Sequence, residues 1–224
     1  SAGMLHVYSC YVTGRISGNG ADSKNEFDIQ NCVLYNYNSN GSNLGNTSCG
    51  FLQDMKSSTI SNNTIFMCTY NSYTASYPLY CMYEITNSTI ANNIILSNWV
   101  TSYYNYDMAG GVYASGSGNS IEHNILSHAS ALDNFPQNKT GYGSKYANLF
   151  NGQGNYSDNY RLSENSDAKG YATDGGEVGC HGGMFGCPAD GRPQYIPYFS
   201  KVVVGSRTED GKLPVSVTVK IQDK

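Results

Sequence analysis

Two acidic residues stand at equivalent places in a repeated sequence pattern. Asp54 lies six residues before Ile60, and Glu84 lies six residues before Ile90. If the copies form neighbouring parallel strands with both carboxylates outward, these carboxylates lie about 5 Å apart. A pair at that separation is typical of a retaining glycoside hydrolase, and it also suits a Ca²⁺ site. We therefore predict that Asp54 and Glu84 are catalytic; the alternative is a solvated acidic pair beside Lys56.

A second candidate is a set of aromatic residues in the segments that follow successive copies of the pattern. Exposed aromatic rings suit the apolar faces of sugar rings, while Asn and Ser side chains hydrogen-bond the hydroxyl groups. Equivalent segments should leave the same side of a repetitive fold, which would gather these rings on one surface. The alternative is that the tyrosines pack on one another to order long loops. The predicted ligand-binding residues are Tyr73, Tyr77, Trp99, Tyr103, Tyr104 and Tyr106.

The cysteines number seven, so at least one of them has no partner within the chain. Cys180 and Cys187 differ from the others because they flank a glycine-rich loop that also contains His181. An oxidising compartment would favour a disulfide between them. A zinc site would use both thiolates and the imidazole, but it would lack a convincing fourth ligand. The sequence leaves the state of this pair open.

The pattern that positions these candidates recurs at a nearly constant period. Its three clear copies begin at Ile60, Ile90 and Ile121, at steps of 30 and 31 residues, and a weaker copy begins at Ile29. Repetition at such a period is typical of stacked, equivalent structural units. The copies are Ile60-Ser61-Asn62-Asn63-Thr64-Ile65, Ile90-Ala91-Asn92-Asn93-Ile94-Ile95 and Ile121-Glu122-His123-Asn124-Ile125-Leu126.

Each copy is preceded by a strand-like run and a polar turn. Both strand segments alternate apolar and polar residues, which is the period-2 signature of one buried face. With Cys81 inward, this alternation sends Leu52 and Met82 outward, followed by Asp54 and Glu84. Paired asparagines at the turns tolerate left-handed backbone and can hydrogen-bond one another along the stack. Stacked parallel strands of this kind predict an all-β fold, a parallel β-helix.

The I-x-N-N-x-I copies resemble those of right-handed parallel β-helix proteins, the pectate-lyase-like group that also includes many bacterial surface proteins. The resemblance covers about residues 5 to 165. A pattern from residue 159 to residue 179 is similar to the closing segment of secreted bacterial β-helix proteins, with Glu177-Val178-Gly179 in place of Asp-Ile-Gly. The resemblance implies fold rather than activity, because one scaffold hosts many functions.

We expect two regions along the chain. Residues 1–190 form the parallel β-helix, which ends in a degenerate closing coil. Residues 191–224 form a proline-containing linker and a β-hairpin, because Asp210-Gly211 is a turn signal between two β-branched runs. Val215, Val217 and Val219 alternate with polar residues, which predicts one buried face. The hairpin is then a cap on the stack, or the start of a β-sandwich.

Composition excludes some partners. Charged residues make up 13 % of the 224 residues, the net charge is −4, and no basic cluster occurs, so nucleic acid is not an expected partner. No apolar run is long enough for a membrane-spanning helix. The weakly charged, Asn- and Tyr-rich make-up favours an exported protein, extracellular or on the outer surface of a bacterial cell.

Three functional hypotheses follow. The first is a secreted or cell-surface protein that binds a polysaccharide or other glycan through the aromatic segments. The second is a polysaccharide lyase or glycoside hydrolase that uses Asp54 and Glu84, with Ca²⁺ as a candidate cofactor. The third is a structural shaft of an adhesin or fibre. Whether the chain is an enzyme stays open, since no G-x-S-x-G, His-Glu-x-x-His, P-loop or dinucleotide motif occurs.

Overall fold

The described part of the protein is all-β. Within it the chain forms strands, turns and bends but no helix, as the sequence predicts. The structure is a computed structural model, and it describes residues 3–18, 25–38, 50–69, 80–97, 118–126, 136–140, 149–151, 160–185, 187, 198–204 and 215–220.

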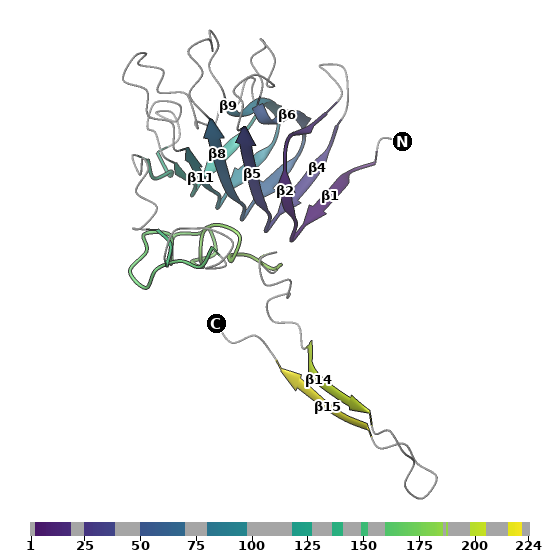
Figure 1. The fold of residues 1–224 in the computed structure, drawn as a ribbon. Coiled ribbons are helices and arrows are strands. Elements are labelled where there is room, and N and C mark those ends of the chain that lie inside the picture. Colours follow the sequence, from purple (N-terminus) through teal and green to yellow (C-terminus); the bar gives the residue numbers. More distant parts are fainter. Residues whose placement is uncertain are drawn as a thin grey trace, which may run out of the picture.

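Three sheets of parallel strands make up the main body, which we call the stack (Figure 1). The chain visits sheet A, sheet B and sheet C in turn, and each visit adds one strand beside the equivalent strand of the previous repeat. The strands of sheet A are β1 (Leu5–Tyr8), β4 (Phe27–Gln30), β7 (Thr59–Ser61), β10 (Thr89–Ala91) and β12 (Ser120–Glu122).

Sheets B and C continue each repeat after a corner. Sheet B comprises β2 (Tyr11–Thr13), β5 (Val33–Asn38), β8 (Thr64–Thr69), β11 (Ile94–Ser97) and β13 (Ile125–Leu126). Sheet C comprises β3 (Ile16–Ser17), β6 (Gly50–Lys56) and β9 (Tyr80–Thr86). This arrangement of stacked parallel strands is compatible with the predicted β-helix.

The repeated isoleucines set the register of sheet A. Ile60 pairs with Ile29 on one side and with Ile90 on the other, and Ile90 pairs with Ile121. All four side chains are buried, and they form one core with residues from sheets B and C, such as Leu52. The parallel stacking predicted from the 30- and 31-residue steps is therefore confirmed.

A ladder of buried asparagines holds the corner between sheets A and B. Asn93 Oδ1 accepts hydrogen bonds from the backbone nitrogen and the Nδ2 of Asn63, at 2.9 and 3.0 Å. Asn93 Nδ2 donates to the carbonyls of Ile60 and Ala91 and to Asn124 Oδ1. The same bonds recur at Asn124, so each repeat satisfies the backbone of its neighbour. The predicted hydrogen bonding along the column is confirmed.

The residue before each ladder position adopts left-handed backbone. Its φ angle is 53° at Asn31, 54° at Asn62, 58° at Asn92 and 54° at His123. Asn and His are among the residues that enter this region most readily, which explains the polar residue at each corner. A second ladder supports the corner between sheets C and A, where Ser58 donates its backbone N–H to Ser88 Oγ at 3.0 Å.

Both ends of the stack depart from the regular period. The first repeat is short, because Val7 pairs with Ile29 at a step of 22 residues. At the other end, Asn138 extends the asparagine ladder: its Oδ1 accepts from the backbone nitrogen and Nδ2 of Asn124, and its Nδ2 donates to the Ile121 carbonyl. Neither end carries the full I-x-N-N-x-I motif, so the repeat pattern did not predict them.

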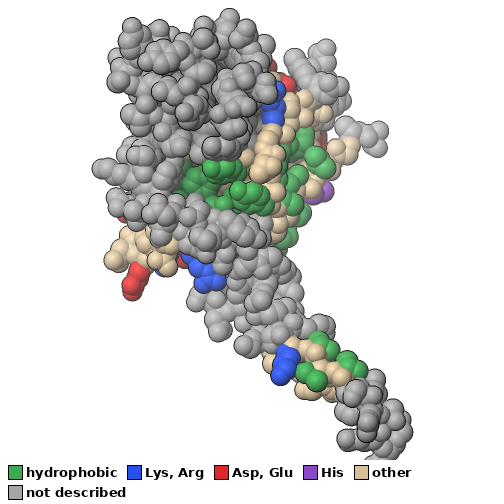
Figure 2. Space-filling model, in the orientation of Figure 1, with side chains coloured by type: hydrophobic (Ala, Val, Ile, Leu, Met, Phe, Trp, Pro, Cys, Tyr) green, Lys and Arg blue, Asp and Glu red, His purple; other side chains and the backbone are tan. Residues whose placement is uncertain are grey.

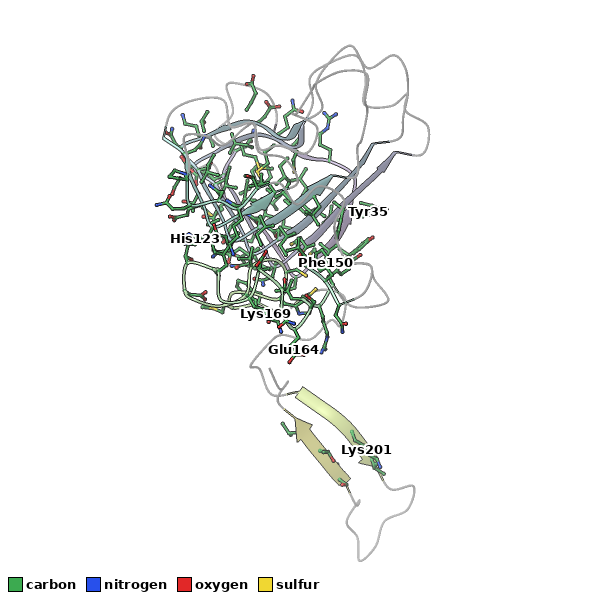
Figure 3. All side chains as sticks on the ribbon, turned by 90° about the vertical axis from the view of Figure 1, so that its left-hand side faces the viewer. Tyr35, His123, Phe150, Glu164, Lys169 and Lys201 are labelled. Carbon is green, nitrogen blue, oxygen red and sulfur yellow. The ribbon has the colours of Figure 1, made fainter. Side chains whose placement is uncertain are left out.

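The segment after residue 149 packs on the outside of sheet B. Phe150 and Leu162 form an antiparallel bridge, whereas a further stacked coil would add a parallel one. Phe150 and Tyr160 contact Phe66, with ring centroids 5.9 and 5.6 Å apart, and together with Ile94 they form a second buried core. Figure 3 shows Phe150 where the stack meets this segment. The segment therefore covers one outer face of the stack.

The predicted C-terminal hairpin is present. Strands β14 (Tyr198–Val204) and β15 (Val215–Lys220) pair antiparallel, and they lie apart from the three sheets in Figure 1. The expected burial of one face is wrong for the described residues, because Val215, Val217 and Val219 are 47–57 % exposed. Figure 2 shows hydrophobic side chains on the hairpin surface. The division into residues 1–190 and 191–224 stays a prediction.

The asparagine ladder predicts a large loss of stability on substitution. Asn93→Ala removes the side-chain bonds described above and leaves buried backbone groups of Asn63, Ile60 and Ala91 without that partner. Because each unsatisfied buried group costs about 1–3 kcal/mol, we expect the free energy of unfolding to fall by about 2–4 kcal/mol in urea denaturation. Lys56→Ala, at an exposed position of β6, is the control. Equal stability of the two variants would contradict a structural role for the ladder.

Candidate functional site

The acidic pair lies in matching positions of sheet C. Gln53 pairs with Tyr83 and Met55 pairs with Ile85, so Asp54 and Glu84 occupy the same place in adjacent parallel strands, β6 and β9. Both side chains are partly exposed. The spacing of parallel strands is about 4.8 Å. The structure therefore brings the two predicted catalytic residues together, as the repeat register required.

The predicted orientation of their neighbours is wrong. Leu52 and Met82 were expected to point outward, but both are fully buried. Asp54 and Glu84 have left-handed backbone, with φ of 54° and 55°, and this interrupts the regular alternation of the strand. As a result Leu52 and Met55, three residues apart, both face the core.

The outer face of sheet A carries a row of polar side chains. His6 pairs with Asp28, and the row continues through Thr59 and Thr89 to Ser120, one residue from each repeat. These residues alternate with the buried isoleucine column, so they lie on the opposite face of the sheet. All are partly or fully exposed. We call this set the open row.

A hydrogen-bonded cluster stands at the N-terminal end of the open row. Tyr8 donates its hydroxyl hydrogen to Asp28 Oδ2, while Gln30 Nε2 donates to Asp28 Oδ1 at 2.6 Å. His6 Nδ1 lies 2.7 Å from the Tyr8 hydroxyl and 3.4 Å from Asp28 Oδ2. The Tyr8 ring stacks on Phe185, with ring centroids 4.4 Å apart. We call His6, Tyr8, Asp28 and Gln30 the Tyr8 cluster.

The Asp28 carboxylate changes the acidity of Tyr8. The hydrogen bond to Asp28 favours the neutral phenol, burial and the negative charge of Asp28 act in the same direction, and together they raise the pKa of Tyr8 to about 12. Tyr8 is therefore a hydrogen-bonding group rather than a base at neutral pH. Sequence reasoning missed the cluster because the short first repeat hides the alignment of β1 with β4. The alternation of His6 and Tyr8 in β1 is the signal that could have found it.

A third feature is the strap, residues 171–185 and 187, which follows the left-handed corner residues from one end of the stack to the other. Tyr171 lies against His123, which is labelled in Figure 3, with ring centroids 5.3 Å apart. Asn92 and Thr173 exchange hydrogen bonds at 3.0 Å through the Thr173 backbone nitrogen and hydroxyl. The strap thus begins on the last repeats.

The strap ends on the first repeats. Cys180 donates its backbone N–H to Thr64 Oγ1 at 3.0 Å. Asn31 Nδ2 donates to the carbonyls of Cys180, at 3.0 Å, and Gly182. A side chain at Gly182 would collide with the Glu177 carbonyl, so glycine is required where the strap turns. The strap therefore contacts both the first and the last repeats of the stack.

Cys180, His181 and Cys187 form a cluster within the strap. Their ligand atoms lie within 4.8 Å of one another, and this is the one group of three or more His, Cys, Asp or Glu side chains with metal-binding spacing in the described ranges. The sulfur atoms of Cys180 and Cys187 lie 2.8 Å apart, and both cysteines are 1 % exposed. Burial raises the pKa of the Cys180 thiol well above its usual value. Asp54 and Glu84 belong to no such group, so the Ca²⁺ prediction stays a prediction.

The predicted aromatic ligand-binding residues lie outside the described residues. Tyr73 and Tyr77 follow β8, and Trp99, Tyr103, Tyr104 and Tyr106 follow β11. What the structure does place is where these segments start: Ser97 at the end of β11 pairs with Met67 in β8. The two aromatic segments therefore leave the stack from neighbouring strands of sheet B.

Comparisons with known proteins do not assign a family. The chain matches no family model, no curated protein sequence and no solved structure at a significant level. Among the described residues, no helix is long and apolar enough to cross a membrane.

The Tyr8 cluster predicts a specific change in titration. Asp28→Asn removes the charged acceptor, so the pKa of Tyr8 should fall from about 12 toward its ordinary value of 10. NMR of tyrosine labelled with ¹³C at Cζ measures this, with the signal assigned by its loss in Tyr8→Phe. An Asp174→Asn variant, at an exposed carboxylate of the strap, is the control and should leave the Tyr8 titration unchanged.

The raised pKa of Tyr8 also predicts how the stability of the fold changes with pH. The pKa is higher in the folded than in the unfolded protein, so the Tyr8–Asp28 contact stabilises the fold fully below pH 10. That contribution is lost as the pH rises from 10 to about 12. A Tyr8 that titrates identically in wild-type protein and Asp28→Asn would contradict the contact.

Proposed function

We propose that this chain is an exported or cell-surface protein of bacterial type that binds glycans on the outside of a right-handed parallel β-helix. The three parallel sheets visited in turn, the 30- and 31-residue steps and the asparagine ladder support the pectate-lyase-like fold. The glycan-binding function is supported by the open row on the surface of the stack and by the aromatic segments that follow β8 and β11.

The open row is the observation that carries this proposal. Five polar side chains at the spacing of parallel strands form a straight line of hydrogen-bonding groups: His6, Asp28, Thr59, Thr89 and Ser120. A pyranose ring is similar in length to the distance between neighbouring strands, which is about 4.8 Å. Successive sugars of an extended chain can therefore meet successive repeats. Hydroxyl and carboxylate groups on a rigid face are suited to sugar hydroxyls.

The aromatic segments supply the second part of the proposal. In the chain, Tyr73 and Tyr77 follow β8, while Trp99 and Tyr103 follow β11, and these two strands are paired in sheet B. Aromatic rings stack on the apolar faces of sugars and provide much of the affinity in such sites. We propose that Tyr104 and Tyr106 extend this surface.

Cleavage of a polysaccharide is the second candidate function, and the register of sheet C favours it. Asp54 and Glu84 are partly exposed and adjacent, and their separation is set by the spacing of parallel strands, which is close to that of retaining carboxylate pairs. In that reaction one carboxylate would attack the anomeric carbon and the other would protonate the leaving oxygen.

Binding is tested by a glycan array followed by calorimetry on any hit. Thr59→Ala combined with Thr89→Ala removes two hydroxyls of the open row, and loss of one or two hydrogen bonds should weaken binding about 5- to 50-fold. Trp99→Ala and Tyr104→Ala should each weaken it as well. Val203→Thr, on the exposed hairpin, is the control and should bind as wild type.

These variants separate the two parts of the binding proposal. Loss in the open-row variant alone places the glycan on sheet A, and loss in the aromatic variants alone places it at the segments after sheet B. Unchanged affinity in every variant would refute both. An array without hits, together with no cleavage, would support a structural shaft.

Cleavage is tested by release of reducing ends or unsaturated products from a panel of neutral and acidic polysaccharides. Asp54→Asn and Glu84→Gln should each reduce the rate at least 100-fold, since each removes a group that acts in the transition state. Glu164→Gln, at an exposed carboxylate of the closing segment, is the control. A wild-type protein that releases no product from any member of the panel would rule out this activity.

A further inference from the structure

The loop between Cys180 and Cys187 is a part of the strap with a feature beyond its hydrogen bonds to the stack: its two end residues lie next to each other. The loop from Cys180 to Cys187 holds two anchors of the strap: Gly182, whose carbonyl accepts from Asn31, and Phe185, which stacks on Tyr8. Both ends of this loop are buried in the second core against sheet B, whereas Met184 between them is 76 % exposed. The loop therefore protrudes from the strap, while Cys180 and Cys187 at its two ends are held in the core.

The two buried ends of the loop, Cys180 and Cys187, have their sulfur atoms in direct contact. Cys180 Sγ and Cys187 Sγ lie 2.8 Å apart, inside the contact distance of two unbonded sulfur atoms, and neither thiol is open to solvent. We propose that Cys180 and Cys187 form a disulfide in the mature protein, and that this bond closes the loop that anchors the strap to the first repeats. The inference is independent of glycan binding.

The same distance argues against a zinc ion at this place. Two thiolates on one tetrahedral zinc, each about 2.3 Å from the metal, lie roughly 3.8 Å apart. His181 could be a third ligand, but no fourth His, Cys, Asp or Glu joins the group among the described residues. A disulfide needs only the two sulfur atoms, which are already in contact.

The reaction is a two-electron oxidation. Two S–H bonds break and one S–S bond forms, and the two electrons and two protons pass to a second disulfide, which is reduced to two thiols. That co-reactant is a disulfide of a thiol–disulfide exchange protein or of a small-molecule thiol, as found in oxidising compartments. Burial of both cysteines in the native protein implies that the exchange takes place before the strap has packed.

The bond would act on the N-terminal end of the open row. Phe185 lies inside the closed loop and stacks on Tyr8, which in turn is hydrogen-bonded to Asp28. A closed loop limits the positions that Phe185 can take in the unfolded and partly unfolded chain. Oxidation therefore holds the Tyr8 cluster together from the side of the strap.

The test uses the full chain, secreted to the bacterial periplasm and alkylated under denaturing conditions without a reductant. No Lys or Arg lies between residues 170 and 191, so trypsin leaves both cysteines on one peptide. We expect this peptide to be unalkylated and lighter by two hydrogen atoms than the dithiol form. Reduction before alkylation should add two alkyl groups to it.

Thermal unfolding provides the second readout. Closing a loop of this size should raise the melting temperature by about 5–10 °C, so a reductant should lower it by that amount in the wild type. The double variant Cys180→Ser and Cys187→Ser should melt at the temperature of the reduced protein and be insensitive to reductant. His181→Ala should keep the disulfide peptide.

Three results would overturn the proposal. Full alkylation of both cysteines without reduction would show free thiols. Linkage of either one to Cys10, Cys32 or another cysteine would show a different pairing. Stoichiometric zinc in the purified protein, lost in His181→Ala, would show a metal site.

Discussion

The hydrogen bonding of backbone groups at the buried corners is the constraint on which the rest of the structure depends. At the corner between sheets A and B the backbone turns inside the protein, where an unpaired N–H or C=O costs about 1–3 kcal/mol. Asn63 resolves this by accepting from the Cys32 backbone nitrogen and donating to the Ile29 carbonyl, and Asn93 does the same for the next repeat. A slip of one residue between repeats would break these bonds and turn the isoleucines out of the core. The ladder therefore fixes the register that all the candidate sites share.

This constraint also limits where function can reside. The inside of the stack is filled by apolar side chains such as Ile60 and Leu52, and the outer face of sheet B is covered by described residues of the segment after residue 148, such as Phe150, Tyr160 and Val178. The described surface of the stack that stays open includes the outer face of sheet A and the partly exposed acidic pair of sheet C. The strap borders the outer face of sheet A, because it is hydrogen-bonded to Asn31 and Asn92, which directly follow strands β4 and β10 of that sheet. Binding on sheet A and the integrity of the strap are thus linked by the Tyr8–Phe185 contact.

The sequence predicted contacts between residues that recur from one repeat to the next. It did not predict contacts that occur at a single place in the structure. The isoleucine steps predicted the pairing of Ile60 with Ile90, and the same steps predicted that Asp54 lies beside Glu84. The short first repeat has Ser9-Cys10 where the three clear copies have Asn-Asn or His-Asn, so its alignment was not visible. The strap contacts join residues far apart in the chain, such as Asn92 with Thr173, 81 positions apart, and Asn31 with Gly182, 151 positions apart, and no periodic signal marks them. The orientation of Leu52 could not be predicted either, because simple alternation places only one of two adjacent residues in the core, whereas Cys81 and Met82 are both buried in the equivalent strand.

The left-handed backbone at Asp54 and Glu84 bears on whether the pair has a role beyond structure. The geometry itself serves the core, because it lets Leu52 and Met55 both point inward, and it recurs in adjacent repeats. Asp is one of the few side chains that enter this region readily, so Asp54 is explained by its backbone alone. Glu is not favoured there, and Gly or Asn would satisfy the same backbone at lower cost. Glu84 therefore adopts this backbone against its local conformational preference, as Ser57 and Tyr160 do elsewhere in the chain. Backbone preference thus accounts for Asp54 but not for Glu84, and the proposed cleavage function would give these two adjacent carboxylates a use together.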